Sequence, residues 1–588
     1  MRILLTAVNA KYIHSNLAVY SLKAYVKDSC VEIAEYTINQ TEDAILGDLY
    51  RRKPDVLCFS CYIWNIELIK SLAREFAKLC PETEIWLGGP EVSYDAEDVL
   101  RRFAQVKGVM KGEGEETFQE LVRAYRDRSC EEEGSFEEAL AGIKGISFRS
   151  RGGEITENPW RPPIDLSKVP FVYENLENFR NRIIYYESSR GCPFSCSYCL
   201  SSIDKSVRFR DLELVKEELA FFLEKKVPQV KFVDREVPQV KFVDRTFNLV
   251  HGHAMEIWRY IKEHDRGKTN FHFEIAADLL DEEEIALISG MRPGLIQLEI
   301  GVQSTNPETI REIRRKMDLE KVGTAVRRIR KAGNIHQHLD LIAGLPYEDL
   351  ESFQRSFDEV YRLRPDQLQL GFLKVLKGSY MKEQEEAYGL VCKSRPPYEV
   401  LKTRWLSYED ILCLKGVEEM VEVYYNSRQF THTVEAMENC FASAFSMYEG
   451  LWRYYQSRGI WDVQHKRSAR YEIFLDFVKE KFPDKEEEIR EWLIYDYYLR
   501  ENAKTRPAFA GEPKMTKEIR RAFYEDEDRL RKYLPEYEKY DKNQMRRMTH
   551  LEYFGKEKQY VLFDYLERNP LNQEARTCII ENREGENL

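Results

Sequence analysis

Three cysteines, Cys192, Cys196 and Cys199, lie within eight residues near the middle of the chain. The spacing Cys-x3-Cys-x2-Cys places three thiolates in one short loop, where they could bind a metal ion or a cluster. A structural zinc site takes four ligands, and no further Cys or His follows within about fifty residues. Three thiolates suit a [4Fe–4S] cluster that keeps one iron open for a substrate or cosubstrate. The loop therefore favours an iron–sulfur cluster over zinc.

The cysteine loop follows the first strand of a series in which strands alternate with helices. Strands are expected at residues 183–188, 240–243, 271–276, 295–301, 338–343 and 367–373. Helical patterns lie between them at residues 212–225, 254–263, 282–289, 319–331 and 351–362. Six such units in about 190 residues predict a partial (β/α)6 barrel of the TIM type. Its chemistry should lie at the carboxyl ends of the strands, and the three cysteines follow one of these ends.

A second alternating pattern occupies the first 125 residues. Short apolar runs at residues 3–8, 55–60, 84–87 and 106–110 are separated by amphipathic segments such as 65–79 and 115–125. Such alternation predicts a Rossmann-like, doubly wound parallel sheet with helices on both faces. Ligands of these sheets bind at the carboxyl ends of the strands. Polar or glycine-rich loops follow the predicted strands at residues 9–16, 60–65, 88–90 and 112–114.

The sequence therefore predicts an α/β chain of four parts. Residues 1–125 form the Rossmann-like domain, and residues 126–180 form a connector with a hairpin near 151–153 and a proline-rich link. Residues 181–395 form the partial barrel. Residues 396–588 are expected to be mainly helical, because the strand pattern fades there. The aromatic residues Phe441, Phe445, Tyr448, Trp452 and Tyr455 have helical spacing and predict a buried helix face.

Composition and charge exclude several classes of protein. Hydrophobic residues make up 43% and charged residues 32% of 588, which rules out disorder as the main state. A net charge of −12 argues against a general phosphate-binding surface, so we expect a small-molecule or peptide substrate rather than nucleic acid. No apolar run approaches the roughly 18 residues of a membrane span, and the start resembles no signal peptide. We expect a cytoplasmic protein without membrane contact.

One nine-residue segment occurs twice. Val227–Arg235 reads VPQVKFVDR, and Val237–Arg245 repeats it letter for letter. Two copies are too few for a repeat architecture, which indicates a recent tandem duplication or an assembly error. The second copy runs directly into Thr246-Phe247-Asn248. We therefore assign the second copy to the barrel strand and the first to an extended connection.

The cysteine spacing, with Tyr198 before the last cysteine, resembles the radical S-adenosylmethionine (SAM) superfamily. This resemblance implies a [4Fe–4S] cluster on Cys192, Cys196 and Cys199, with SAM bound to the unique iron. One electron from the cluster would cleave SAM to methionine and a 5′-deoxyadenosyl radical. The electron would come from an external donor such as flavodoxin or ferredoxin.

Other barrel segments are also similar to this superfamily. They are residues 246–248, 298–304 and the Gly-Leu-Pro-x-Glu turn at residues 344–348. The similarity suggests polar SAM contacts from Tyr198, Glu274, Gln303 and Ser304, and Arg208 or Arg210 could pair with the SAM carboxylate. Each of these side chains could instead cap a helix or satisfy a polar group in the core.

The N-terminal domain resembles the cobalamin (B12)-binding domain found ahead of the barrel in many radical SAM proteins. The resemblance rests on residues 54–60, 86–90 and 112–115, and it implies that Ser60, Gly88, Gly89, Gly112 and Gly114 contact cobalamin. Glycines there let the backbone approach the nucleotide tail.

That family usually carries an Asp-x-His-x-x-Gly loop whose histidine binds cobalt, whereas this chain has His14 without the Asp or the Gly. The missing carboxylate removes the usual support for the imidazole, so we expect His14 to leave cobalt free. Cys58 and Cys61 span the end of a predicted strand, which favours structural thiols over a redox pair.

These resemblances imply a cobalamin-dependent radical SAM enzyme, and methyl transfer to an unactivated carbon is the commonest outcome of that architecture. Three alternatives stay open at this point. One is a cobalamin-dependent cyclase or rearrangement enzyme, the second is a radical SAM enzyme without cobalamin, and the third is a non-catalytic sensor. The open iron argues against the sensor. No sequence feature identifies the substrate or a role for residues 396–588.

Overall fold

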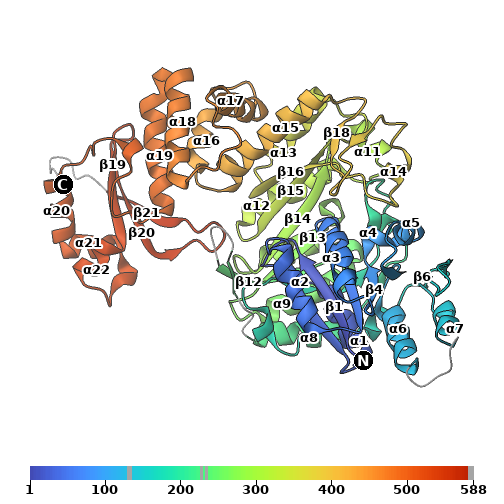
Figure 1. Ribbon diagram of the computed structural model, residues 1–588. Helices are drawn as coiled ribbons and strands as arrows, with labels where there is room; N and C mark the ends of the chain where they lie inside the picture. The colour runs from blue at the N-terminus through green and yellow to red at the C-terminus, as the bar shows by residue number, and fades with distance from the viewer. Residues whose placement is uncertain (129–134, 226–228, 232–235, 581–588) are drawn as a thin grey trace. The chain divides into compact units, whose positions relative to one another are not determined.

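The computed structural model of the protein describes residues 1–128, 135–225, 229–231 and 236–580 (Figure 1). The chain divides into two compact units. The first consists of Met1–Phe353 and Gly371–Tyr408, and the second of Gln354–Leu370 and Glu409–Leu588. No helix within the described residues is long and apolar enough to span a membrane.

The first unit opens with a seven-stranded sheet in the order β2-β1-β3-β4-β5-β6-β7. Its strands are β1 (Ile3–Asn9), β2 (Val31–Thr37), β3 (Val56–Ser60), β4 (Glu84–Gly88), β5 (Val106–Met110), β6 (Ile146–Arg149) and β7 (Ile155–Glu157). Its helices are α1 (Leu17–Val26), α2 (Glu42–Arg52), α3 (Ile66–Leu79), α4 (Pro90–Ser93), α5 (Ala96–Arg102), α6 (Glu115–Asp127) and α7 (Ser135–Gly142). Strands β1 to β5 are parallel, as the sequence predicts.

Burial explains why these segments form a parallel sheet. Every residue of β1 is buried, as expected for a strand covered on both faces. Leu4 and Val8 join one hydrophobic cluster, whereas Ile3, Leu5 and Ala7 join another. The alternation places one cluster on each face of the sheet.

Two parts of this sheet differ from the sequence prediction. Strand β2 has no continuous apolar run and was not predicted. It lies at the edge of the sheet, and only Val31, Ala34 and Tyr36 are buried. The predicted hairpin near residues 151–153 is present as β6 and β7. It pairs with β5 and so extends the N-terminal sheet, rather than standing apart in a connector.

The second sheet forms the partial barrel. Its strands are β8 (Ile184–Tyr186), β12 (Glu236–Phe242), β13 (Asn270–Ile275), β14 (Ile296–Gln303), β15 (His336–Ala343) and β16 (Gln367–Phe372). Strand β12 pairs with β8 and β13, and the order continues through β14 and β15 to β16 (Figure 1). The main helices are α8 (Leu212–Glu224), α9 (His251–His264), α10 (Glu282–Ser289), α11 (Pro307–Glu312), α12 (Leu319–Ala332) and α13 (Leu350–Tyr361).

Shorter elements connect or follow the barrel units. They are η1 (Leu166–Lys168), η2 (Leu176–Phe179), β9 (Ser189–Arg190), η3 (Leu200–Ser202), β10 (Arg208–Phe209), β11 (Gln229–Lys231), η4 (Phe247–Leu249), η5 (Ala277–Leu279), α14 (Tyr380–Glu383), β17 (Val391–Cys392) and β18 (Val400–Lys402).

The structure assigns the two copies of the repeated segment differently. The second copy supplies most of the parallel strand β12, as predicted. Of the first copy, only residues 229–231 are described. They form β11, which runs antiparallel to the start of β12 and is therefore no additional barrel strand. The rest of the first copy lies outside the described residues.

The second unit is mainly helical. Its helices after α13 are α15 (Tyr408–Val421), the π-helix η6 (Glu422–Asn426), α16 (Thr431–Glu438), α17 (Ala444–Ser457), α18 (Arg467–Lys481), η7 (Pro483–Lys485), α19 (Glu486–Arg500), η8 (Ala508–Ala510), α20 (Lys517–Glu525), α21 (Glu527–Tyr533), η9 (Pro535–Tyr537) and α22 (Lys542–Arg547). Helix α17 buries Phe445, Tyr448, Trp452 and Tyr455, as their spacing predicts. Phe441, the fifth aromatic residue of that pattern, precedes the helix and is only partly buried.

The sequence did not predict the small antiparallel sheet that ends the second unit. It consists of β19 (Thr549–Phe554), β20 (Gln559–Arg568) and β21 (Ala575–Ile580). The α/β fold class, with its two parallel sheets and a mainly helical C-terminal part, is nevertheless confirmed.

Candidate functional site

The cluster loop, residues 191–199, connects β9 to η3 at the carboxyl end of the first barrel strand. Cys192 and Cys196 are buried and Cys199 is partly exposed. The Ser202 hydroxyl donates to the carbonyl oxygens of Cys196 and Cys199, at 3.0 and 2.6 Å. Gly191 has a φ of +99°, and a Cβ there would lie 2.0 Å from the Ser206 carbonyl oxygen. The loop therefore requires glycine before its first cysteine.

The three cysteines supply three thiolates from one short loop. In a [4Fe–4S] cluster each cysteine would bind a different iron, which leaves the fourth iron open.

A buried carboxylate fixes the chain where it enters the cluster loop. Asp244 is fully buried and accepts hydrogen bonds from the Ser188 backbone and hydroxyl, at 3.0 and 2.7 Å, and from the Ser189 hydroxyl at 2.6 Å. Burial raises the pKa of Asp244 to about 6, although these hydrogen bonds favour the charged form. Asp244 belongs to the second copy of the repeat, so that copy also positions the loop.

Arg315 is a site residue that sequence reasoning missed. Its Nη1 lies 3.8 Å from Cys196 Sγ and 3.4 Å from the Tyr198 hydroxyl. A guanidinium beside thiolates offsets their negative charge, which favours an anionic cluster. Residues 196 and 315 are far apart in the sequence, so spacing alone could not have paired them.

The cluster loop borders a cavity of about 140 Å³ inside the barrel mouth, called here the cluster pocket. Cys196, Glu274 and Gln303 line it, which brings two of the predicted SAM contacts to the cluster loop. The Gln303 side-chain oxygen is buried and accepts no hydrogen bond from the described residues. An orphaned buried acceptor indicates a ligand donor.

Three other predicted SAM contacts lie elsewhere. Ser304 is fully buried, and its hydroxyl donates to Glu348 of the Gly-Leu-Pro-x-Glu turn at 2.6 Å. Arg210 is buried, where it pairs with Glu218 and donates to two backbone carbonyls of residues 166 and 169. Arg208 binds Glu113 with both terminal nitrogens, at 2.7 and 2.9 Å. Each of these three side chains therefore has a partner elsewhere in the protein, and none of them lines the cluster pocket.

Charged groups line or border the cluster pocket. Lys241 Nζ lies 3.0 Å from Glu299 and 3.6 Å from Glu274. Burial raises the pKa of Glu274. Burial also opposes ionisation of Glu299, but the His272 hydrogen bond and the Lys241 charge hold the pKa of Glu299 below its usual range. The pocket therefore offers carboxylate acceptors of different basicity to a ligand.

A larger cavity of about 730 Å³ lies at the carboxyl ends of the N-terminal strands, and is called here the sheet-end cavity. Ser60, Gly88, Gly89, Gly112 and Gly114, the predicted cobalamin contacts, all line it. Barrel residues complete its wall, among them Tyr185, Arg190 and Arg245. Its size suits a cofactor.

Gly89 is required by the protein's own backbone. Its φ is +113°, and a Cβ there would lie 2.5 Å from the Cys61 carbonyl oxygen. A side chain at Gly89 would thus displace the loop after β3, whether or not a ligand is bound. Cys58 and Cys61 are both buried, and burial raises the pKa of each thiol to about 12. Such thiols react poorly, which agrees with the predicted structural role.

His14 lines the sheet-end cavity, but it has a partner. Its Nδ1 lies 2.6 Å from the Tyr185 hydroxyl of β8. Burial lowers the pKa of His14, and the charges of Lys11 and Lys241 lower it further. The imidazole of His14 thus has a tyrosine hydroxyl, and not a carboxylate, as its hydrogen-bond partner.

Arg190 connects the sheet-end cavity to the cluster loop. It lies two residues before Cys192 and forms ion pairs with Glu115 at 2.9 Å, with Glu187 at 2.7 Å and with Glu113 at 3.5 Å. Glu113 lies in the glycine-rich loop before α6, Glu115 is the first residue of α6, and both line the cavity. The same ion-pair network therefore positions both the cavity wall and the cysteines.

Three family models match the chain. They are a B12 binding domain over residues 3–122, the radical SAM superfamily over residues 186–360 and a protein family of unknown function, DUF4080, over residues 386–578. Cobalamin, a [4Fe–4S] cluster and SAM are the cofactors of the first two domains.

The chain is also similar to curated proteins and to a solved structure. The chain is 27% identical over 323 residues to 2-(S-pantetheinyl)-carbapenam-3-carboxylate methyltransferase of Streptantibioticus cattleyicolor, which covers 51% of this chain and 44% of that protein. It is 22% identical over 358 residues to anaerobic magnesium-protoporphyrin IX monomethyl ester cyclase of Rubrivivax gelatinosus, which covers 59% and 61%. The chain thus spans about half the length of these curated relatives.

The solved structure is that of the cobalamin-dependent SAM radical enzyme OxsB with aqua-cobalamin bound. It superposes with a TM-score of 0.57 and 14% identity, covering 86% of this chain and 82% of that one. The likeness establishes the shared fold. With its cysteine loop, its barrel and these family matches, the chain belongs to the radical SAM superfamily and carries an N-terminal B12-binding domain and a C-terminal domain of unknown function.

Proposed function

We propose that the protein is a cobalamin-dependent radical SAM methyltransferase that acts on an unactivated carbon. One observation carries this proposal: Arg245 lines both the sheet-end cavity and the cluster pocket. The two cavities are therefore neighbours within the first unit. A substrate near Arg245 would be within reach of both cofactors. Methyl transfer requires this, because cobalamin would supply the methyl group and SAM cleavage at the cluster would produce the substrate radical.

Different residues of the chain act at each of the two cavities. When bound, the reduced cluster cleaves SAM to give a radical, and cobalamin carries the methyl group. Arg315 offsets the charge of the cysteine thiolates. Gln303 and Glu274 would accept hydrogen bonds from bound SAM. Tyr198 lies within the cysteine loop, and Arg315 donates to its hydroxyl.

The acceptor is a small molecule or a peptide, and the electron comes from a protein such as flavodoxin or ferredoxin. The net charge of −12 supports an acceptor other than nucleic acid. A cyclase is the second candidate, because one curated relative is named as an anaerobic cyclase. A cyclase would use the same two cavities but would transfer no methyl group.

The test is anaerobic SAM cleavage. The parent, reconstituted with iron, sulfide and cobalamin, is incubated with SAM and dithionite, and 5′-deoxyadenosine is measured. Cys196→Ala should abolish the product and lower the iron content below about four per chain. Cys392→Ala, a cysteine of β17 outside both cavities, is the matched control and should behave as the parent. Cleavage that survives in Cys196→Ala would overturn the cluster assignment.

A further inference from the structure

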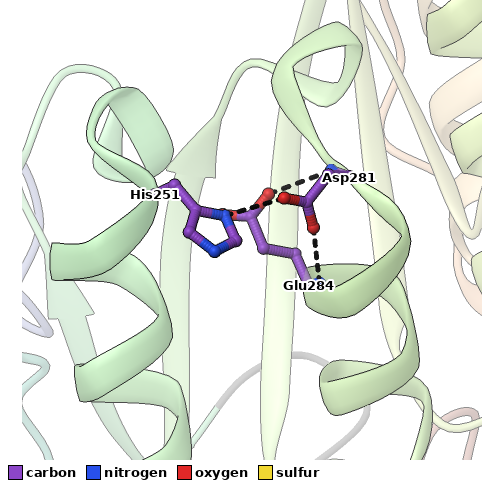
Figure 2. A group of neighbouring side chains, drawn as sticks. All are labelled: His251, Asp281 and Glu284. Carbon is purple, nitrogen blue, oxygen red and sulfur yellow. Dashed lines mark hydrogen bonds and ion pairs between the residues drawn. The ribbon is translucent and has the colours of Figure 1, made fainter.

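Three side chains from two neighbouring barrel loops converge away from both cavities (Figure 2). His251 is the first residue of α9, which follows β12. Asp281 is the N-cap of α10, which follows β13, and Glu284 lies in the first turn of α10. Their ligand atoms all lie within 4.8 Å of one another.

The capping box of α10 orients two carboxylate oxygens toward His251. Asp281 Oδ1 accepts from the Glu284 backbone N–H at 2.9 Å, and Glu284 Oε2 accepts from the Asp281 backbone N–H at 3.1 Å. Each side chain therefore has one oxygen left. Asp281 Oδ2 lies 2.9 Å from His251 Nδ1, and Glu284 Oε1 lies 3.6 Å from it.

The buried carboxylate of Glu284 lacks a hydrogen-bond donor at one of its two oxygens. Glu284 is 1% exposed, and its Oε1 accepts no hydrogen bond from the residues that the structure describes. A buried carboxylate oxygen without a hydrogen-bond donor is costly. The charge of Glu284 is therefore not fully compensated by hydrogen-bond donors at this oxygen. A cation beside Oε1 would compensate it.

We propose that His251, Asp281 and Glu284 form a binding site for one divalent zinc ion. One imidazole nitrogen and two carboxylate oxygens are ligands that zinc accepts, whereas magnesium and calcium prefer oxygen alone. Ligand atoms at about 2.1 Å from one ion lie about 3.0 to 3.4 Å apart. The observed 2.9 and 3.6 Å bracket that range.

The ion would link two loops that also serve the cluster pocket. Thr246 precedes His251 on the first loop, and Asp278 precedes Asp281 on the second, and both line that pocket. His251 and Asp281 are 47% and 51% exposed, so water can complete the coordination from the solvent side. The site is separate from the cysteine loop and does not depend on the proposed reaction.

The test is an anaerobic zinc titration of the cluster-loaded full-length protein, in which iron already occupies the cysteines. A chromophoric chelator competes for zinc, and affinity and stoichiometry are measured. The parent should bind one zinc that millimolar magnesium does not displace. His251→Ala and Glu284→Gln should each weaken this binding at least tenfold. Glutamine can still close a capping box, so Glu284→Gln keeps α10 intact.

The matched control is His264→Ala, an exposed histidine at the other end of α9. It should bind zinc as the parent does, and circular dichroism should show that all three variants are folded. The proposal is overturned if the folded His251→Ala and Glu284→Gln variants bind zinc with the parent's affinity and stoichiometry. It is also overturned if the cluster-loaded parent binds no zinc.

Discussion

Replacing Arg190 with methionine should disturb both cavities at once. Arg190 compensates three carboxylates, Glu113, Glu115 and Glu187, and is itself 21% exposed. Removing one partner of a buried ion pair typically costs 3–5 kcal/mol, because the remaining charge is left uncompensated. Because the Arg190 side chain is partly exposed, we expect Arg190→Met to cost about 3 kcal/mol, near the lower end of this range. Methionine keeps much of the apolar contact of the side chain, so the loss is mainly electrostatic.

A double variant separates electrostatics from packing. Glu115 is 6% exposed, so it is the carboxylate that suffers most from losing Arg190. Adding Glu115→Gln to Arg190→Met removes that uncompensated charge and should recover at least about 1 kcal/mol. The assays are denaturant unfolding of the metal-free protein and a cobalamin titration, because the ion pairs border the sheet-end cavity.

Arg182→Met is the matched control for this experiment. Arg182 pairs with Glu35, which is 7% exposed, and neither residue lines the sheet-end cavity. Both single variants should be destabilised, but only Arg190→Met should also weaken cobalamin binding and lower iron content. If Arg190→Met costs less than about 1 kcal/mol and binds cobalamin as the parent does, the ion-pair network has no role in linking the two cavities.

Three further predictions follow from particular residues. Burial lowers the pKa of His272 from 6.5 to about 4, overcoming the opposing effect of Glu299. Above pH 6.5, the contribution of neutral His272 to the free energy of unfolding is fully present. It is lost as the pH falls from 6.5 to about 4, and the loss amounts to about 3 kcal/mol. His272→Gln should remove this loss when the free energy of unfolding is measured as a function of pH. His14→Ala should leave the absorption spectrum of bound cobalamin unchanged, because we expect no bond to cobalt; conversion from a histidine-ligated to an unligated spectrum would contradict this. Deleting residues 227–236 should preserve solubility and iron content, because the second copy of the repeat forms β12; loss of soluble protein would show that both copies are structural.

The sequence predicted the parts of the fold that depend on local pattern. Apolar runs such as that of β1 identified the buried parallel strands, and cysteine spacing identified the cluster loop. Strand β2 and the C-terminal sheet were missed. The edge strand β2 buries only Val31, Ala34 and Tyr36 of its seven residues and so lacks a continuous apolar run.

Contacts between distant residues could not be predicted in the same way. Arg208 follows the cysteine loop, which suggested a ligand contact, yet its guanidinium binds Glu113 from another domain. Arg315 approaches Cys196 across more than a hundred residues of sequence. The first pair forms where the barrel packs against the N-terminal domain, and the second forms within the barrel itself. A single sequence carries no record of either contact.

The most direct test of methyl transfer through cobalamin follows the methyl group itself. The reconstituted protein, with its cobalamin reduced to the cob(I) state, is given SAM whose methyl group is deuterated, and the cobalamin fraction is analysed by mass spectrometry. Methyl transfer through cobalamin should give a deuterated methyl group in that fraction and an equivalent amount of S-adenosylhomocysteine. Formation of 5′-deoxyadenosine without any label in the cobalamin fraction would contradict methyl transfer and favour the cyclase or a cobalamin-independent radical enzyme.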